Sequence, residues 1–410
     1  MNKELLVKYA NLIVRTGANL QKGQEVVIDC SIEAYDFIKI LVEEFYKEGA
    51  KKVRIKWGDP ALTTIKYKYE DEDTLSNLTS YQKEEYEYDI KNLPVKVFIT
   101  SDAPDALKDV DVKKLIDVMK VLRPKIRFYR DQMEDEYQWI IAAYPSYDWA
   151  EQVYPGLDRE EAFEKLLEAI LQVSRVDDKN DPNKNWEVHD GNLTCRSELL
   201  NNMKLVKLTY KSKNGTDFCV GLNPDVRWEG GGMYTKKTHV YFNPNIPSEE
   251  VFTSPIRGKA EGIVYSSKPL SYNGNLIEDF SVRFENGKAV EVHAKTNEDI
   301  LKSIIDTDEN SAYLGECALI GYTSPISQLN TVFYETLFDE NASCHLAFGM
   351  GFQSLYPDYD KYSVDELFEK GINKSATHVD FMIGTSDMSI IGTDINGVEH
   401  VLFHEGERVF

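Results

Sequence analysis

The stretch Gly23-Gln24-Glu25-Val26-Val27-Ile28 decides the fold of the first half of the chain. A turn signal opens an apolar run that is short enough to be a buried strand. Apolar residues then recur at helical spacing from Phe37 to Phe45 and stop at Gly49, which predicts a helix. A strand followed by a helix is the repeating unit of an α/β fold.

The same alternation continues along the chain from this unit. Residues 53–57 alternate in hydrophobicity like a strand, and two further apolar runs cover residues 95–100 and 139–143, with helical stretches between them. Residues 1 to about 175 therefore predict an α/β fold with a largely parallel sheet. No glycine-rich phosphate-binding motif lies at a predicted strand-to-helix turn, so motifs give nucleotide binding no support.

The second half is dominated by predicted strands joined by Asn-Gly turns. Asn214-Gly215, Asn286-Gly287 and Asn396-Gly397 each separate two strand-like runs, which is the pattern of antiparallel hairpins. We therefore predict an α+β, mostly antiparallel fold for this half. A few helices accompany the strands, including one over residues 297–305.

The length of 410 residues is too great for one ordinary hydrophobic core, so we expect two domains. A predicted helix over residues 158–176 is followed by the polar, turn-rich run 177–185, which looks like a boundary. We accordingly expect an N-terminal α/β domain over residues 1–180 and a C-terminal catalytic, metal-binding domain over residues 181–410.

Composition argues against several classes of partner. The chain has 69 acidic and 47 basic residues, a formal net charge of −22, and this field repels phosphate backbones and anionic lipid surfaces. We therefore expect neither nucleic acid nor membrane as a partner. No apolar run approaches the roughly 18 residues that a membrane span requires. Five cysteines without a C-x-x-C pair fit neither a disulfide framework nor a zinc ribbon, so we expect a reducing, cytoplasmic location.

The histidines indicate where the chemistry lies. All seven fall beyond residue 188, so any metal or acid–base site that uses histidine belongs to the second half. The sharpest pattern there is Thr377-His378-Val379-Asp380-Phe381, where the period of two of a strand puts His378 and Asp380 on one face. Such a pair of side chains can bind one metal ion or bridge two. An isolated His-x-Asp pattern is, however, more often a hydrogen-bonded pair on the surface.

Two further segments offer ligand-type side chains, each with a plain structural alternative. Segment 339–349 runs from a carboxylate-rich loop containing Glu340 into a strand with His345, which could also be a satisfied core histidine. Segment 314–320 places Glu316 at the head of an apolar strand. A carboxylate there either faces solvent or needs a cationic partner, and a metal ion would serve.

A fourth segment, residues 244–253, contains Glu249 and Glu250 behind a serine that could equally cap a helix. Together the four segments supply carboxylates and imidazoles, with Glu340 in reserve. This mixture suits zinc, manganese or cobalt in a hydrolytic dinuclear centre, where carboxylates can bridge ions roughly 3.5–4 Å apart. The candidate ligands are Glu250, Glu316, His345, His378 and Asp380.

Thiolate ligation is the other chemistry that these segments offer. Cys317 and Cys344 neighbour Glu316 and His345 in sequence, so on a strand they point to the opposite face. We interpret both cysteines as packing residues.

These segments also carry a resemblance to a known family. The chain resembles the metal-dependent aminopeptidases of the bacterial aminopeptidase T and aminopeptidase S type in Pro-Asn-Ile-Pro-Ser-Glu-Glu-Val-Phe-Thr-Ser-Pro at 244–255, Leu-Gly-Glu at 314–316, Leu-Phe-Asp-Glu-Asn-Ala-Ser-Cys-His-Leu-Ala-Phe-Gly at 337–349 and His-Val-Asp-Phe-Met-Ile-Gly at 378–384. The likeness extends through Ala142-Ala143-Tyr144-Pro145 and Trp228-Glu229-Gly230-Gly231, so it covers essentially the whole chain.

The resemblance implies an activity and a metal site. It implies removal of N-terminal residues from peptides, two divalent ions (zinc, cobalt, manganese or magnesium) and a homodimer with an enclosed active-site cavity. It places Glu340 on a carboxylate near the metals. The residues that fall on the family's metal-ligand positions are Glu250, Glu316, His345, His378 and Asp380.

One position departs from the family pattern. The family has a tyrosine seven residues after the histidine of the His-x-Ala-x-Gly strand, interpreted as a hydrogen-bond donor to the tetrahedral intermediate, whereas this chain has Phe352. Loss of one such donor typically costs about 10²–10³ in rate, roughly 2.7–4 kcal/mol. Tyr356 or Tyr359 is a candidate to supply the hydroxyl instead.

Two points of mechanism stay open in the sequence. Glu249 is a candidate general base that takes a proton from the attacking water and returns it to the leaving amine, although adjacent residues on a strand point apart. The alternatives to an active aminopeptidase are a dinuclear hydrolase of another substrate class and a catalytically impaired member that binds metal or peptide without turnover. Phe352 is the best argument for the impaired member.

Overall fold

The computed structural model describes residues 3–272 and 274–410, and the chain divides into two compact units. One unit comprises the described residues up to Glu187 together with Gly232–Pro247, and the other comprises Val188–Gly231 and Ser248–Phe410. Neither unit is therefore one continuous segment. No helix within the described ranges has the length and apolar character that a membrane span requires.

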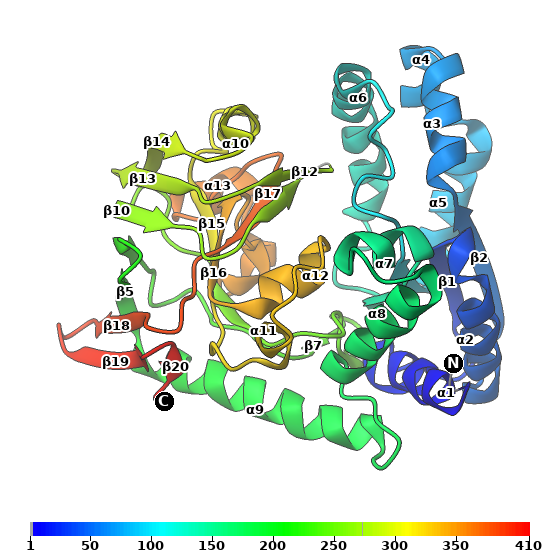
Figure 1. The fold of residues 1–410 in the computed structure, drawn as a ribbon, viewed down its shortest axis with the longest axis horizontal. Coiled ribbons are helices and arrows are strands. Elements are labelled where there is room, and N and C mark those ends of the chain that lie inside the picture. Colours follow the sequence, from blue (N-terminus) through cyan, green and yellow to red (C-terminus); the bar gives the residue numbers. More distant parts are fainter. Residues whose placement is uncertain (1–2, 273) are drawn as a thin grey trace. The chain divides into compact units, whose positions relative to one another are not determined.

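The first unit is built on a four-stranded parallel sheet with the order β2-β1-β3-β4 (Figure 1). This confirms the predicted parallel sheet, and its strands contain the four predicted runs. The elements are α1 (Lys3–Leu12), β1 (Glu25–Ser31), α2 (Tyr35–Glu48), β2 (Lys52–Gly58), α3 (Pro60–Tyr69), α4 (Glu72–Ser76), α5 (Ser80–Asn92), β3 (Val95–Thr100), α6 (Val112–Arg130), β4 (Trp139–Ala143), α7 (Tyr147–Val153), α8 (Arg159–Val173), β7 (Met233–Tyr234) and β8 (Tyr241–Phe242).

Aromatic side chains from three elements form part of the core of this unit. The rings of Tyr9 in α1 and Phe37 in α2 stack at 5.4 Å, and Phe37 stacks on Tyr144, which follows β4, at 4.9 Å. The Tyr9 hydroxyl also donates a hydrogen bond to the Ala143 carbonyl at 2.9 Å, so this buried phenol has a partner. These contacts fix α1 and α2 against the sheet.

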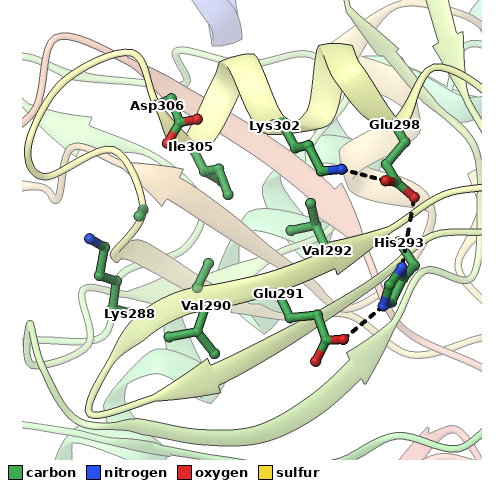
Figure 2. A pocket seen from close by; sticks show the side chains of 11 residues that line it. Lys288, Val290, Glu291, Val292, His293, Glu298, Lys302, Ile305 and Asp306 are labelled. Atoms are coloured by element: carbon green, nitrogen blue, oxygen red, sulfur yellow. Dashed lines mark hydrogen bonds and ion pairs between the residues drawn. The ribbon is translucent and has the colours of Figure 1, made fainter.

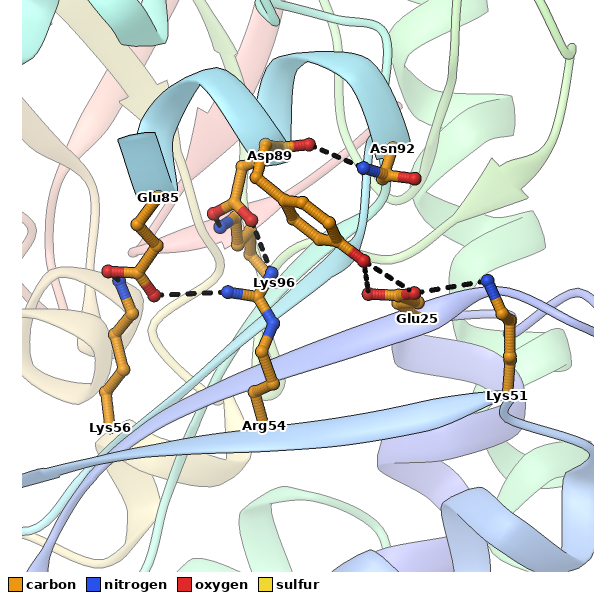
Figure 3. Close-up of polar contacts among 9 residues, drawn as sticks. Glu25, Lys51, Arg54, Lys56, Glu85, Asp89, Asn92 and Lys96 are labelled. Atoms are coloured by element: carbon orange, nitrogen blue, oxygen red, sulfur yellow. Dashed lines mark hydrogen bonds and ion pairs between the residues drawn. The ribbon is translucent and has the colours of Figure 1, made fainter. Parts of the chain in front are cut away.

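Charged side chains anchor α5 on the sheet. Figure 3 shows Arg54 of β2 and Lys96 of β3 donating hydrogen bonds to Asp89 of α5, a carboxylate that is only 1% exposed. Arg54 also reaches Glu85 of the same helix at 3.1 Å. A buried carboxylate is tolerated when cations pair with it, so this network replaces apolar packing at the α5 contact.

The second unit contains an eight-stranded antiparallel sheet, β14-β13-β10-β6-β5-β18-β19-β20, and a four-stranded antiparallel sheet, β17-β16-β15-β9. All three predicted Asn-Gly hairpins are confirmed as the pairs β5–β6, β13–β14 and β18–β19. The strands are β5 (Leu205–Lys211), β6 (Asp217–Gly221), β9 (Val251–Thr253), β10 (Ala260–Tyr265), β11 (Leu270–Tyr272), β12 (Asn275–Ile277), β13 (Ser281–Glu285), β14 (Lys288–His293), β15 (Leu314–Leu319), β16 (His345–Gly349), β17 (His378–Met382), β18 (Ser389–Asp394), β19 (Glu399–His404) and β20 (Glu407–Arg408).

Short helices accompany these sheets. The predicted helix over residues 297–305 is confirmed as α10, with Asn297 at its N-cap position. The helices are α10 (Glu298–Ile305), α11 (Pro325–Gln328), α12 (Thr336–Asp339) and α13 (Val364–Glu369).

The long helix α9 (Pro182–Met203) is the main element that the sequence analysis missed. The sequence pattern predicts a turn-rich segment up to residue 185 and strands after it, where the structure has a helix. The buried stripe of α9 has helical spacing, but polar residues occupy part of it and hide the hydrophobic period. Its buried members are Trp186, His189, Leu193, Ser197 and Leu200.

Candidate metal centre

The four-stranded antiparallel sheet of the second unit, β17-β16-β15-β9, aligns four of the predicted ligands. Ala347 of β16 pairs with Glu316 of β15 on one side and with Asp380 of β17 on the other. Because alternate residues of a strand share a face, His345 and His378 project to the same side as these two carboxylates. The strand register alone thus gathers two imidazoles and two carboxylates on one face.

The fifth predicted ligand, Glu250, reaches this face from the segment before β9. His345 Nε2 lies 3.2 Å from Glu250 Oε2, and His378 Nε2 lies 3.1 Å from Glu316 Oε2 and 3.2 Å from Asp380 Oδ1. Ligand atoms of Glu250, Glu316 and His345 lie within 4.8 Å of one another, and so do those of Glu316, His378 and Asp380. We call these sets the Glu250 triad and the Asp380 triad; Glu316 belongs to both.

Backbone carbonyls orient both imidazoles. His345 Nδ1 lies 3.3 Å from the Ser343 carbonyl, and His378 Nδ1 lies 2.8 Å from the Met350 carbonyl. An Nδ1–H that donates to a carbonyl leaves Nε2 directed at the carboxylates, and loss of the Nε2 proton gives the tautomer of a metal-binding histidine.

The carboxylates of the site oppose one another's ionisation. Burial raises the pKa of Glu316 to about 7, and the charges of Glu250 and Asp380 add to this rise. Burial, followed by the same two charges, raises the pKa of Glu340 well above its usual value. Burial disfavours the charged form of His345, but its hydrogen bond to Glu250 and the charges of the neighbouring carboxylates together outweigh this and raise its pKa to about 10. The site therefore attracts positive charge.

The donor set fits a divalent cation. Asp380 Oδ1 is buried, and within the described part of the chain the nearby His378 Nε2, at 3.2 Å, makes no well-aligned hydrogen bond to it. Three carboxylates and two neutral imidazoles are the oxygen and nitrogen ligands that zinc, manganese and cobalt take. A carboxylate shared by two ligand sets, as Glu316 is, can bridge two ions.

Glu340 and Glu249 lie beside the triads in different ways. Glu340 interacts electrostatically with Asp380 and Glu250, and its Oε1 lies 3.4 Å from the Asn341 side-chain amide. Glu249 is 6% exposed, and its Oε2 lies 3.9 Å from His189 Nε2. Neither residue belongs to the two triads.

Phe352 packs directly on a predicted ligand. Its ring lies 5.2 Å from the His378 ring at an interplanar angle of 55°, and 5.1 Å from the Phe252 ring. Tyr356 packs in the same apolar cluster, and Lys370 Nζ lies 5.3 Å from its ring centroid. Phe352 therefore packs beside His378 and brings no hydroxyl to this side of the site.

The other face of the four-stranded sheet is hydrophobic. Cys317 and Cys344 are buried in the main core cluster of this unit, on the side away from the ligands, as strand alternation predicts. Leu346, Phe348 and Phe381 share that cluster. The sheet thus separates a polar site from the core.

A depression elsewhere in this unit lies between α10 and β14 (Figure 2). His293 bridges two carboxylates there, with Nε2 at 2.9 Å from Glu291 and Nδ1 at 3.8 Å from Glu298, and Lys302 pairs with Glu298. These groups are largely solvated and satisfy one another, so we interpret the depression as a surface ion-pair network. The predicted ligands do not line it.

Comparison with known proteins identifies the family. Residues 2–407 match the family model described as Thermophilic metalloprotease (M29). The chain belongs to the M29 metalloprotease family. This M29 chain is 40% identical to aminopeptidase AmpS of Bacillus subtilis over 403 residues, which is 98% of each protein. It is 37% identical to aminopeptidase T of Thermus thermophilus over 412 residues, 99% of each.

A solved structure agrees with this assignment. Wild-type AmpT from Thermus thermophilus matches the M29 chain with a TM-score of 0.91 at 36% identity, covering 100% of both chains. The predicted resemblance to the aminopeptidase T and S type is therefore confirmed. A 2,5-dihydroxypyridine dioxygenase from Pseudomonas putida KT2440 matches with a TM-score of 0.53 at 12% identity, which shows a shared fold alone.

Asp339, next to Glu340, should give this M29 chain a pH-dependent stability. Burial raises its pKa to about 7, against a hydrogen bond from the Phe333 N–H and the charge of Lys268. An acid whose pKa is higher in the folded than in the unfolded chain holds more protons when folded, so stability falls as the pH rises from about 4 to about 7.

We expect Asp339→Asn to remove the fall in the free energy of unfolding that ionisation of Asp339 causes, which is on the order of a few kcal/mol. The amide oxygen can still accept the hydrogen bond from the Phe333 N–H, and it carries no charge. The measurement is thermal unfolding of the metal-stripped protein at pH 5 and pH 8 for both chains. An unchanged difference between the two pH values in the variant would show that Asp339 does not titrate in this range.

Proposed function

We propose that this chain is a metallo-aminopeptidase that releases N-terminal residues from peptides at a dinuclear metal centre. Family membership and the names of the relatives support the hydrolase activity and the peptide substrate. The observation that carries the dinuclear centre is the pair of triads that share Glu316.

The roles of the residues follow from the two triads. We assign Glu250 and His345 to one ion, His378 and Asp380 to the other, and Glu316 to both. When bound, two divalent ions (zinc, cobalt, manganese or magnesium) would acidify a bridging water and polarise the scissile carbonyl. The chain supplies the orientation of both imidazoles through backbone carbonyls and a face that the sheet separates from the core.

Proton transfer needs a carboxylate that is not a ligand. Glu249 is the predicted base, and its carboxylate lies toward His189. Glu340 is the second candidate, since its charge interacts with Glu250, Asp380 and His345. The acid-rich site would also favour the α-ammonium of a peptide substrate over a negatively charged N-terminal group.

Two further properties stay predictions. The homodimer rests on the family resemblance and the cytoplasmic location on the cysteine content. Sedimentation of the purified chain would test the dimer, and a single species at 47.0 kDa would contradict it.

Removal and return of metal tests the proposed function. The chain should lose the hydrolysis of leucyl amides and dipeptides after treatment with a chelator, and regain it with zinc, cobalt, manganese or magnesium added singly. Binding of the ions should also raise the free energy of unfolding, by about 2.7 kcal/mol per site at a metal concentration 100 times the Kd.

Two variants and a panel of substrates extend this experiment. Unchanged turnover in Glu249→Gln would remove Glu249 as the base, and Glu340→Gln in the same panel tests the second candidate. Metal-dependent stabilisation without hydrolysis of any peptide would favour the impaired member, for which Phe352 against His378 is the supporting contact. Hydrolysis of phosphoesters alone would favour the other dinuclear hydrolase.

A further inference from the structure

The segment Ser248-Glu249-Glu250 has no regular secondary structure, yet it carries a predicted ligand. Two hydrogen-bonding contacts hold its backbone. His189 Nε2 of α9 lies 2.7 Å from the Ser248 carbonyl oxygen, and the Glu249 N–H donates to Asn341 Oδ1 at 2.7 Å. A β-carbon on Gly230 would lie 2.7 Å from the Glu250 carbonyl oxygen, so only glycine fits beside this ligand.

Asn341 is the contact that joins this segment to another part of the site. The residue is fully buried, and its Nδ2 donates to the Leu337 carbonyl at 3.0 Å and lies 3.4 Å from Glu340 Oε1. Its side-chain oxygen therefore accepts a hydrogen bond from Glu249, and its side-chain nitrogen contacts the segment that contains Leu337 and Glu340. We call this set of contacts the Asn341 bridge.

The chemistry of the bridge requires an amide. A side-chain amide presents one acceptor oxygen and one donor nitrogen from the same rigid plane. An aspartate would lack the donor, and an aliphatic residue would lack both groups. Because the bridge is buried, water cannot replace these bonds without opening the structure.

We propose that Asn341 is a positioning residue of the metal centre, which holds Glu250 against the short 3-10 helix Glu340–Ala342 and so sets the geometry of the Glu250 triad. This inference rests on the proposed dinuclear function. The Asp380 triad has separate supports, namely the pairing of β17 with β16 and the bond between His378 and the Met350 carbonyl. Loss of the bridge therefore affects one ion more than the other.

The test is a metal titration of the chelator-stripped protein. Calorimetry measures the binding of zinc, and visible absorption measures the binding of cobalt. The wild-type chain takes up two ions. In Asn341→Ala the affinity for one of them falls about 10–100-fold, which is the usual effect of losing a residue that orients a ligand. The other ion binds as in the wild type. Wild-type affinity for both ions in Asn341→Ala overturns the proposal.

Two variants separate positioning from general stability. Asn341→Asp keeps the acceptor for the Glu249 N–H but lacks the donor to the Leu337 carbonyl, so the affinity for the same ion also falls while the other ion binds as in the wild type. Gln138→Ala is the matched control, because Gln138 is a buried amide of the first unit that accepts a hydrogen bond from Gln24 Nε2 at 3.0 Å and donates one to the Asn19 carbonyl at 3.2 Å. This control lowers the unfolding temperature and leaves both affinities unchanged.

Equal weakening of the binding of both ions in the Asn341 and Gln138 variants would overturn the proposal, because it would show a general loss of structure. If Asn341→Ala does not fold, Asn341→Ser is titrated in its place, since its hydroxyl is too short to span the bridge. A wild-type chain that binds two ions but cleaves no peptide defeats the proposed function alone, and the titration still decides the role of Asn341. A wild-type chain that binds one ion overturns both.

Discussion

Glu316→Gln is expected to lose both metal ions together. The amide keeps the size of the side chain but removes the charge that the Glu250 triad and the Asp380 triad share. Affinity for each ion should fall by more than about 100-fold, beyond the range seen for residues that only orient ligands. Hydrolysis of leucyl amides should fall with it. The measurement is a zinc titration of the stripped protein beside the assay.

Without metal, the Glu316→Gln variant should be at least as stable as the metal-free wild type. Burial and neighbouring charges already disfavour ionised Glu316, so a neutral side chain relieves the site. Glu25→Gln is the matched control, because Glu25 is 6% exposed in the first unit and bonds to Tyr88 at 3.0 Å. It should leave metal binding intact. Retention of one ion at full affinity in Glu316→Gln would show that Glu316 does not bridge.

Phe352→Tyr is expected to raise kcat by up to about 100-fold with little change in KM. The substitution adds one hydroxyl to a ring that lies 5.2 Å from the His378 ring, and a donor to the oxyanion of the intermediate is typically worth about 10²–10³ in rate. Such a donor acts mainly in the transition state, so kcat and kcat/KM should rise together. Steady-state kinetics with leucyl amides measure both.

Phe252→Tyr is the control for this change. Phe252 packs on Phe352 in the same apolar cluster, so it receives the same hydroxyl without facing His378. Its kcat should stay at the wild-type value. An unchanged kcat in Phe352→Tyr would mean that another group already stabilises the oxyanion, and Tyr356 and Tyr359 would be the next residues to replace.

The fold was predictable where its signals are local. The Asn-Gly turns specify hairpins because both residues tolerate a positive φ; Asn286 has 51° and Gly287 has 80°. Helix α9 was not predictable, because its buried stripe includes His189 and Ser197, whose burial depends on contacts with distant segments. The signal that could have indicated it is Trp186, Leu193 and Leu200 at seven-residue spacing.

The residue types of the site were predictable, but their assembly was not. The alternation of His378 and Asp380 is visible in the sequence, whereas the pairing of β15, β16 and β17 that brings Glu316 to them is a tertiary property. Asn341 lies next to Glu340 in the sequence but gains its role from Glu249, 92 residues away. The signal available in the sequence was an amide inside the predicted ligand segment 339–349, directly after Glu340.

The strand alternation that separates ligands from core also has a consequence for misfolding. If β17 slipped by one residue against β16, His378 and Asp380 would enter the hydrophobic core, and Val379 and Phe381 would replace them on the polar face. An unpaired ion in such a core costs several kcal/mol, so the slipped pairing of β17 with β16 is unstable. The ionisable side chains thus act as a checkpoint for correct strand pairing, before any metal or peptide is present.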